Sequence, residues 1–261
     1  MRPVIKSLLG AAFIVALVGS ALASPQVDGA VFNLRVFNDC PTSVLTMVND
    51  YPTLISIHDE VLDCAGWANL HNWQLAVGGA AAVFNNGDAF TLSFDLRITG
   101  AGDGEAGLLI APWWSQNVDG RFNVRSTDGE IACFGGRLPF YSFTANYGLA
   151  YVKGDVIRLT AVYTPNDMTE ANPADIEYIV DYGGMIYSSG RLPFDEGNPA
   201  EDPPYGLWGM LNDARVGGYM QAFLQNGNPA AELMAEWMSI DYVDMSVATE
   251  DATWGMVKSL Y

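Results

Sequence analysis

The sequence predicts an all-β protein, a two-sheet antiparallel jelly-roll sandwich with little helix. Residues 90–99 alternate strictly between apolar and polar side chains, which is typical of a strand with one face in a core and one in water. Asp-Gly pairs at 119–120 and 128–129 flank alternating runs and indicate hairpin turns. The 27 Gly and 13 Pro are spread widely, which fits many short strands joined by turns.

The first 23 residues are typical of a signal peptide. Arg2 and Lys6 supply positive charge, an apolar stretch follows, and Ala21-Leu22-Ala23 has the small-x-small pattern of a cleavage site. We therefore expect a secreted protein, extracellular or periplasmic, with an uncleaved membrane anchor as the alternative.

The rest of the chain is expected to form one domain, residues 24–248, followed by a tail, 249–261, that is a short helix or stays loose. Half of the residues are apolar, which is enough for one large core. The formal net charge of −18 excludes nucleic acid as a natural partner, because no basic patch is present to replace phosphate counterions. No later apolar run reaches membrane length, so we expect no membrane insertion after signal cleavage.

Strands are expected along the whole chain, with turns at 49–52 and 85–88 between the early ones. The expected strands are 31–37, 44–48, 54–57, 73–77, 90–99, 107–114, 121–125, 130–134, 156–163, 176–182, 219–224 and 235–247. Residues 229–236 are expected to form a short turn of helix before the last strand.

The three cysteines predict one disulfide and one free thiol. Cys40 and Cys64 flank a short segment near turn residues, so in an oxidising compartment we expect them to pair and to stabilise the fold by roughly 3 kcal/mol. Cys133 lies in an apolar run and is expected to be a buried free thiol.

One five-residue segment occurs twice. Gly-Arg-Leu-Pro-Phe stands at 136–140 and again at 190–194. We interpret it as two equivalent strand-to-loop corners of a pseudo-symmetric sandwich, with an arginine-bearing binding motif used twice as the alternative.

Taken together, the strands resemble the concanavalin A-like lectin/glucanase superfamily, which includes laminin-G-like modules. The resemblance spans roughly residues 28–248 and rests on 90–98 followed by 107–111, on Val-Gly-Gly-Tyr at 216–219, and on the closing strand 235–245. It implies two stacked antiparallel sheets, one of them concave. Members include lectins and retaining glycoside hydrolases, so the resemblance implies no single function.

The sequence assigns no catalytic residue. Retaining members of that superfamily carry closely spaced carboxylates on one strand, and this chain has no such motif; Glu177 and Asp181 share a face but stand about 13 Å apart along a strand. An inverting pair on separate strands remains an alternative. His58 and His71 match no zinc module or hydrolase signature, and we expect surface or hydrogen-bonding roles for them.

Aromatic residues are the candidate ligand-binding groups. Trp113 and Trp114 end an expected strand, where one ring would enter the core and the other would stand outside as a sugar-stacking platform. Tyr205 and Trp208 form a second candidate group. Packing of these rings in the core or in loops is the alternative interpretation.

Calcium is the one cofactor considered. Asp103 and Glu105 in one segment, and Asp195 and Asn198 in another, offer oxygen ligands without forming an EF-hand loop. A charge-rich loop is usually only solvated, so we expect no cofactor, with calcium as the alternative.

From these features we expect a secreted, non-enzymatic β-sandwich that binds carbohydrate or another extracellular surface, with an extracellular glycan or a cell-surface component as partner. A glycoside hydrolase with acid and base on separate strands is one alternative. An extracellular structural protein without a small ligand is the other.

Overall fold

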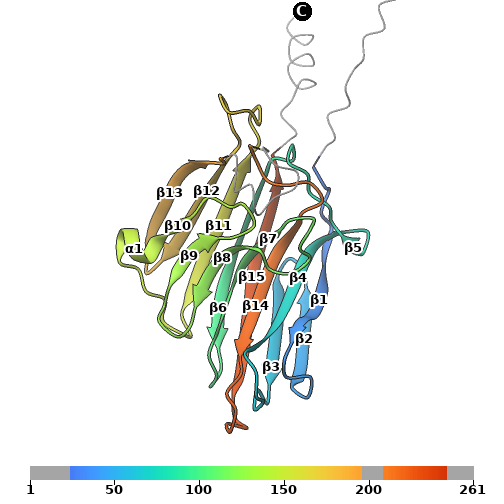
Figure 1. Ribbon diagram of the computed structural model, residues 1–261, viewed down its shortest axis with the longest axis vertical. Coiled ribbons are helices and arrows are strands. Elements are labelled where there is room, and N and C mark those ends of the chain that lie inside the picture. Colours follow the sequence, from blue (N-terminus) through green and yellow to red (C-terminus); the bar gives the residue numbers. More distant parts are fainter. Residues whose placement is uncertain (1–23, 196–207, 246–261) are drawn as a thin grey trace, which may run out of the picture.

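The computed structural model describes residues 24–195 and 208–245, which form two antiparallel sheets stacked face to face with one short helix. Figure 1 shows the strands running along the long axis of the molecule, with the helix at one edge. The expected fold class, an all-β antiparallel two-sheet sandwich with little helix, is confirmed.

The first sheet has eight strands in the order β1-β4-β14-β7-β8-β9-β10, and β5 pairs with β4. Its strands are β1 (Gly29–Asn38), β4 (Ala68–Val77), β5 (Ala80–Ala81), β7 (Gly104–Ala111), β8 (Gly120–Arg125), β9 (Ile131–Phe134), β10 (Tyr141–Ser142) and β14 (Arg215–Phe223).

The second sheet has seven strands in the order β13-β12-β11-β6-β15-β3-β2. Its strands are β2 (Val44–Asp50), β3 (Leu54–Glu60), β6 (Phe90–Thr99), β11 (Val156–Thr164), β12 (Asp175–Tyr182), β13 (Met185–Pro193) and β15 (Glu232–Asp244).

The core lies between the sheets and is built from the inward residues of each alternating run. On β6 these are the apolar residues predicted for that face, all fully buried: Phe90, Leu92, Phe94, Leu96 and Ile98. Trp73 of β4 and Trp237 of β15 meet edge to face, with ring centroids 6.0 Å apart. The indole of Trp237 donates a hydrogen bond to the carbonyl of Gly107 on β7, at 3.2 Å, which ties the two sheets together.

Among the described residues the helix is α1 (Phe143–Tyr147), in a segment for which the sequence predicted none. The side chain of Ser142 caps its start by accepting from the backbone of Ala145, and Gly148 ends it in a left-handed conformation. The helical turn expected at 229–236 is wrong, because β15 begins at Glu232. There, side chains alternate between buried and half-buried, and this period of two favours strand pairing over helix.

The repeated pentapeptide does not form equivalent corners. The first copy lies in the loop between β9 and β10, where Gly136 and Arg137 have positive φ, whereas the second copy lies mostly within β13. Phe140 is 71% exposed, but Phe194 is only 1% exposed. The two copies lie near each other, since Arg137 donates to the backbone carbonyl of Asp195.

The disulfide Cys40–Cys64 is formed and Cys133 is a buried free thiol, as expected. The assigned signal peptide, 1–23, and the tail, 249–261, lie outside the described residues, so both stay predictions. Within the described part of the chain, no helix is long and apolar enough to cross a membrane.

Candidate functional site

The outer face of the first sheet carries polar side chains that are buried although they point away from the core. Strand register places Asn72 of β4, Tyr219 of β14, Gly107 of β7 and Asn123 of β8 in one row across the sheet. Asn72, Tyr219 and Asn123 are each 0% exposed. An outward face of an antiparallel sheet is ordinarily wetted, so this burial sets the row apart.

Polar atoms in this row lack partners within the described part of the chain. Neither side-chain amide atom of Asn72 has a hydrogen-bond partner there, and Nδ2 of Asn123 has none either. Asn123 does accept from the hydroxyl of Tyr219 through its Oδ1, at 2.7 Å. Buried amides are nearly always satisfied, so these groups are suited to meet a ligand or water.

A charged pair lies beside the row. Arg121 of β8 forms a salt bridge with Glu105 of β7, with Nη1 and Oε1 2.5 Å apart, and its guanidinium also lies 5.3 Å from the ring centre of Tyr219. A second nitrogen of Arg121 donates to Gln221 of β14 at 3.4 Å. The exposed fractions of the Arg121 and Glu105 side chains are 18% and 6%.

This environment changes the acidity of two groups. Burial raises the pKa of Glu105 above its ordinary value, although Arg121 and Arg125 act in the opposite direction. Burial raises the pKa of Tyr219 well above its ordinary value, and the charge of Glu105 acts in the same direction. Tyr219 is therefore a protonated hydroxyl at neutral pH, able to donate a proton but not to remove one.

Gly107 leaves the centre of the row without a side chain. A Cβ at this position would lie within 1.9 Å of the carbonyl oxygen of Phe122 on the neighbouring strand. Because position 107 is bare, the Tyr219 hydroxyl reaches across the strand to Asn123.

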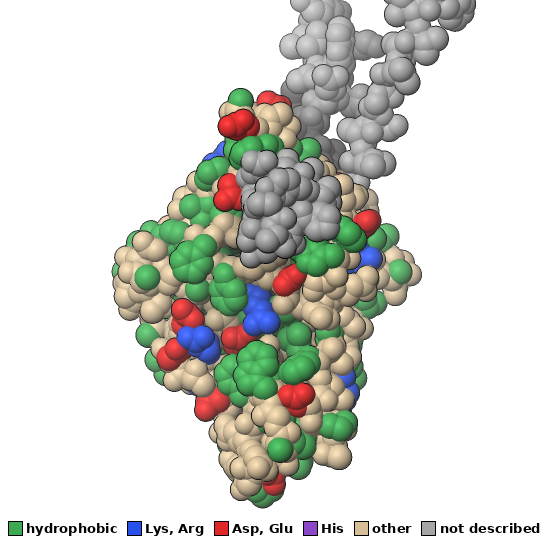
Figure 2. All heavy atoms as spheres, viewed as in Figure 1, with side chains coloured by type: hydrophobic (Ala, Val, Ile, Leu, Met, Phe, Trp, Pro, Cys, Tyr) green, Lys and Arg blue, Asp and Glu red, His purple; other side chains and the backbone are tan. Residues whose placement is uncertain are grey.

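A hollow of about 230 Å³ opens next to Arg121 on the same face. Its lining residues are Phe37, Trp67, Leu70, Ser115, Asn117, Val118, Asp119, Arg121 and Gln221. Trp67 is 62% exposed and its ring contacts those of Phe37 and Phe223, with centroids 6.1 and 6.5 Å apart. Figure 2 shows one face of the molecule, with basic side chains close to acidic and hydrophobic ones near its centre.

The structure describes three of the four aromatic residues predicted to bind a ligand. Trp113 and Trp114 lie in the turn after β7 rather than on a strand, with ring centroids 6.0 Å apart. The expectation that one ring enters the core is wrong, because β7 ends at Ala111 and strand alternation no longer applies. Trp208 is half-buried and its carbonyl accepts from Ala174, whereas Tyr205 lies outside the described residues.

The acidic residues considered for calcium are used in other contacts. Asp103 forms an ion pair with Lys153 at 3.2 Å, and Glu105 pairs with Arg121. The carbonyl of Asp195 accepts from Arg137, and Asn198 lies outside the described residues. In the described ranges, the group of three metal-ligating side chains that does come together is a different one, His58, Glu60 and Glu232.

The other histidine, His71, belongs to a buried polar cluster between the sheets. Its Nε2 lies 3.0 Å from Asp59 Oδ2, and its Nδ1 accepts from the backbone N–H of Arg35 at 3.1 Å. Nε2 therefore carries the proton and donates to Asp59. Both side chains are 0% exposed and lie on the inward faces of β4 and β3, so this pair stabilises the interior of the sandwich.

Comparisons with known proteins give likeness of fold only. No family model matches the chain, and no curated protein matches it. Among solved structures, the alginate lyase from Klebsiella pneumoniae is 9% identical with a TM-score of 0.46, over 83% of this chain and 95% of that one. An alginate lyase of polysaccharide lyase family 7 is 13% identical with a TM-score of 0.43, over 82% and 94%. The alginate lyase from Corynebacterium sp. is 12% identical with a TM-score of 0.42, over 82% and 93%.

The sequence led us to expect a non-enzymatic binding protein, whereas the solved structures with a similar fold are alginate lyases, so that expectation is corrected. At these identities the likeness concerns the fold, so the reaction has to be argued from the site itself.

Proposed function

We propose that this protein is a carbohydrate-active enzyme, a lyase that cleaves an acidic polysaccharide of the alginate type on the outer face of its first sheet. The observation that carries the proposal is the buried polar row with unpartnered amides, next to the Arg121–Glu105 pair. Extracellular polysaccharide also fits the secreted location that residues 1–23 predict, which stays a prediction.

The cluster holds the groups that β-elimination from a uronic acid requires. The sugar carboxylate must be neutralised so that the adjacent C5–H becomes acidic, and Arg121 and the amide of Asn72 are suited to this. A base must remove the C5 proton, and Glu105 is the carboxylate in contact with Arg121. An acid must protonate the departing glycosidic oxygen, and Tyr219 remains protonated at neutral pH.

The hollow beside Arg121 supports binding of a sugar chain. The exposed ring of Trp67 offers an apolar surface on which a sugar ring can stack, while Asn117 and Gln221 offer hydrogen bonds to hydroxyl groups. The overall charge is strongly negative, so binding of a polyanion would rely on this local arginine rather than on long-range attraction.

The test is to incubate the full chain with alginate and with a neutral β-glucan. We expect an unsaturated uronate, seen by its ultraviolet absorbance, from alginate alone. Tyr219→Phe removes one hydroxyl and is expected to lower kcat by about 10²- to 10⁴-fold. Tyr187→Phe removes a hydroxyl on β13 of the second sheet and should leave kcat unchanged.

Three results would overturn the proposal. Reducing ends without ultraviolet absorbance would indicate hydrolysis instead of elimination. Equal turnover by Tyr219→Phe and wild type would remove Tyr219 from the reaction. Absence of cleavage of any acidic polysaccharide by folded wild-type protein would reject lyase activity.

A further inference from the structure

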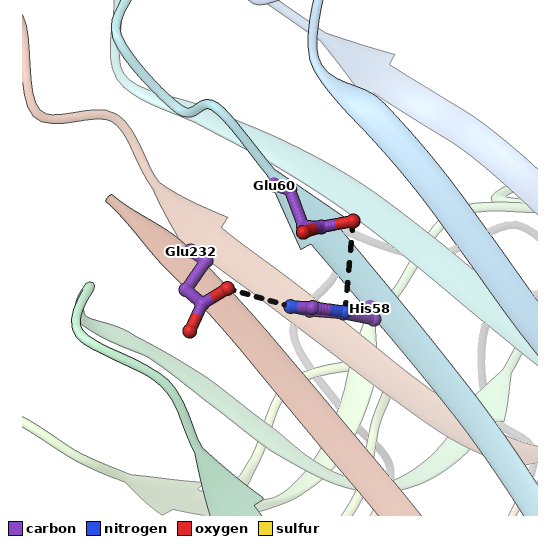
Figure 3. Close-up of side chains that lie close together, drawn as sticks. All are labelled: His58, Glu60 and Glu232. Carbon is purple, nitrogen blue, oxygen red and sulfur yellow. Dashed lines mark hydrogen bonds and ion pairs between the residues drawn. The ribbon is translucent and has the colours of Figure 1, made fainter. Parts of the chain in front are cut away.

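A second cluster of reactive side chains lies on the outer face of the second sheet, away from the candidate active site. His58 and Glu60 stand two residues apart on β3 and share a face, and Glu232 begins the neighbouring strand β15. We propose that these three side chains bind a divalent transition-metal ion of the zinc type. Figure 3 shows the imidazole edge-on between the two carboxylates.

The first argument is electrostatic. Glu60 and Glu232 are directly opposite each other in the antiparallel pairing of β3 and β15. Like charges at such a position are destabilising. Among the described residues, His58 is the side chain that forms an ion-pair contact with either of them. A divalent cation bound between the two carboxylates would remove this repulsion.

The second argument is geometric. One ligand atom from each of the three side chains can be chosen so that all lie within 4.8 Å of one another. The Nε2 of His58 is 3.0 Å from Oε2 of Glu232, and its Nδ1 is 3.8 Å from Oε2 of Glu60. Two ligands held about 2.0–2.2 Å from one tetrahedral zinc ion stand roughly 3.3–3.6 Å apart, so the two observed separations lie just below and just above this spacing. Glu60 now lies on the Nδ1 side of the ring, so its carboxylate would have to move toward Nε2 to share an ion with Glu232 and His58.

The third argument concerns access and support. The exposed fractions of the side chains are 24% for His58, 37% for Glu60 and 38% for Glu232, so an ion and one or two waters can reach them. The backbone beneath is fixed, because the carbonyl of Glu232 accepts from the N–H of Gly102 at 2.7 Å. Lys153 in turn donates to the carbonyl of Gly102 at 2.6 Å. A site with rigid backbone and adjustable side chains is suited to metal binding.

The ligand set determines the type of metal. An imidazole nitrogen with two carboxylates suits zinc and its first-row neighbours, whereas calcium takes six to eight oxygen ligands. The proposed site is therefore distinct from the calcium ligands considered from the sequence, which are other residues.

The experiment measures binding of Zn²⁺ alone by equilibrium dialysis, and the melting temperature with and without Zn²⁺, on full-length, tag-free protein. Wild type should bind one ion and melt higher with Zn²⁺, and Ca²⁺ should give neither effect. His58→Asn and Glu232→Gln should each weaken binding at least about tenfold, since loss of even an indirect metal partner has an effect of this size. The matched control Glu170→Gln removes an exposed carboxylate elsewhere and should bind as wild type does.

Other results would overturn the proposal. Failure of wild type to bind Zn²⁺ would leave the cluster as a histidine that only pairs with two carboxylates. Undiminished binding by both variants would place the metal elsewhere. Dialysis is read on protein shown to be folded by circular dichroism, so a destabilised variant is not mistaken for a non-binding one. None of these measurements depends on lyase activity.

Discussion

The two outer faces of the sandwich obey the same alternation yet hold their charges differently. On the first sheet, the side chains of the Arg121–Glu105 pair are 18% and 6% exposed and lie among buried amides. On the second sheet, the corresponding values are 40% and 13% for Arg97–Glu236, and 33% and 31% for Arg158–Asp95. The second face is thus the wetted surface that the pattern predicts, and the first is not.

This difference in burial indicates that the charged and polar groups of the first face serve a purpose other than stability. A surface ion pair contributes little to folding stability, because water competes for both partners. Burying charged and polar groups on an outer face is costly unless they are paired or meet a ligand. The first face is therefore the better place to look for chemistry, because ionisable groups whose pKa is shifted by burial commonly mark functional sites.

Removing one arginine from each face should produce the largest difference between the faces, measured as the loss in the free energy of unfolding. Arg121→Ala leaves Glu105 buried without its partner, so we expect a loss of about 3–5 kcal/mol in the free energy of unfolding. Arg97→Ala breaks a half-exposed pair and should cost about 1 kcal/mol or less. Urea unfolding of both variants checks this, and equal losses would abolish the distinction between the faces.

The pH dependence of stability should sharpen the comparison, because two buried carboxylates have shifts of opposite sign. For Asp59, burial alone would raise the pKa, but hydrogen bonds from His71, Ser43 and Asn69 outweigh it and the pKa is lowered below 3.8. Its contribution is present above pH 3.8 and is lost as the pH falls through the folded-state pKa. For Glu105 the pKa is raised above 4.5, so its contribution is present below pH 4.5 and is lost as the pH rises through the folded-state pKa.

Unfolding free energies measured across this acidic range should therefore diverge. The advantage of wild type over Asp59→Asn should grow as the pH rises, whereas its stability relative to Glu105→Gln should fall. If both stability differences changed with pH in the same direction, the assignment of opposite pKa shifts would be contradicted.

The smallest effect concerns the exposed tryptophans. Trp67→Ala removes the ring beside the hollow and should raise KM for the polysaccharide about two- to tenfold. Trp113→Ala removes a ring that is 40% exposed in the turn after β7, and tests the sugar contact predicted from the sequence. Both should cost about 1 kcal/mol of stability or less, because neither ring is in the core. A KM effect confined to Trp113→Ala would move the sugar platform to that turn.

Much of the fold could be predicted because the alternating runs are local signals. The strand 90–99 matches β6 residue for residue, and the turn at 128–129 lies between β8 and β9 as expected. The strand β13 was missed because its side chains are mostly exposed or half-buried and give weak alternation. The helix α1 was missed because five residues provide too little periodicity, although the sequence contains the serine and glycine that cap it.

The candidate site was largely missed, for a physical reason. The alternation at 121–125 and the segment Val-Gly-Gly-Tyr at 216–219 were both visible in the sequence. What could not be read was that Tyr219 and Asn123 would be buried on an outer face and bonded to each other across Gly107. Such burial depends on strand order, which brings β14, β7 and β8 side by side.

Gly107 sets a limit on how this surface can be redesigned. Random mutagenesis of the row can vary the chemistry at 72, 123 and 219, but any side chain at 107 would strike the carbonyl oxygen of Phe122. New reactive groups can thus be added around the centre of the row, never at it. A library that fixes glycine at 107 and diversifies its neighbours would sample substrate preference while keeping the strand spacing intact.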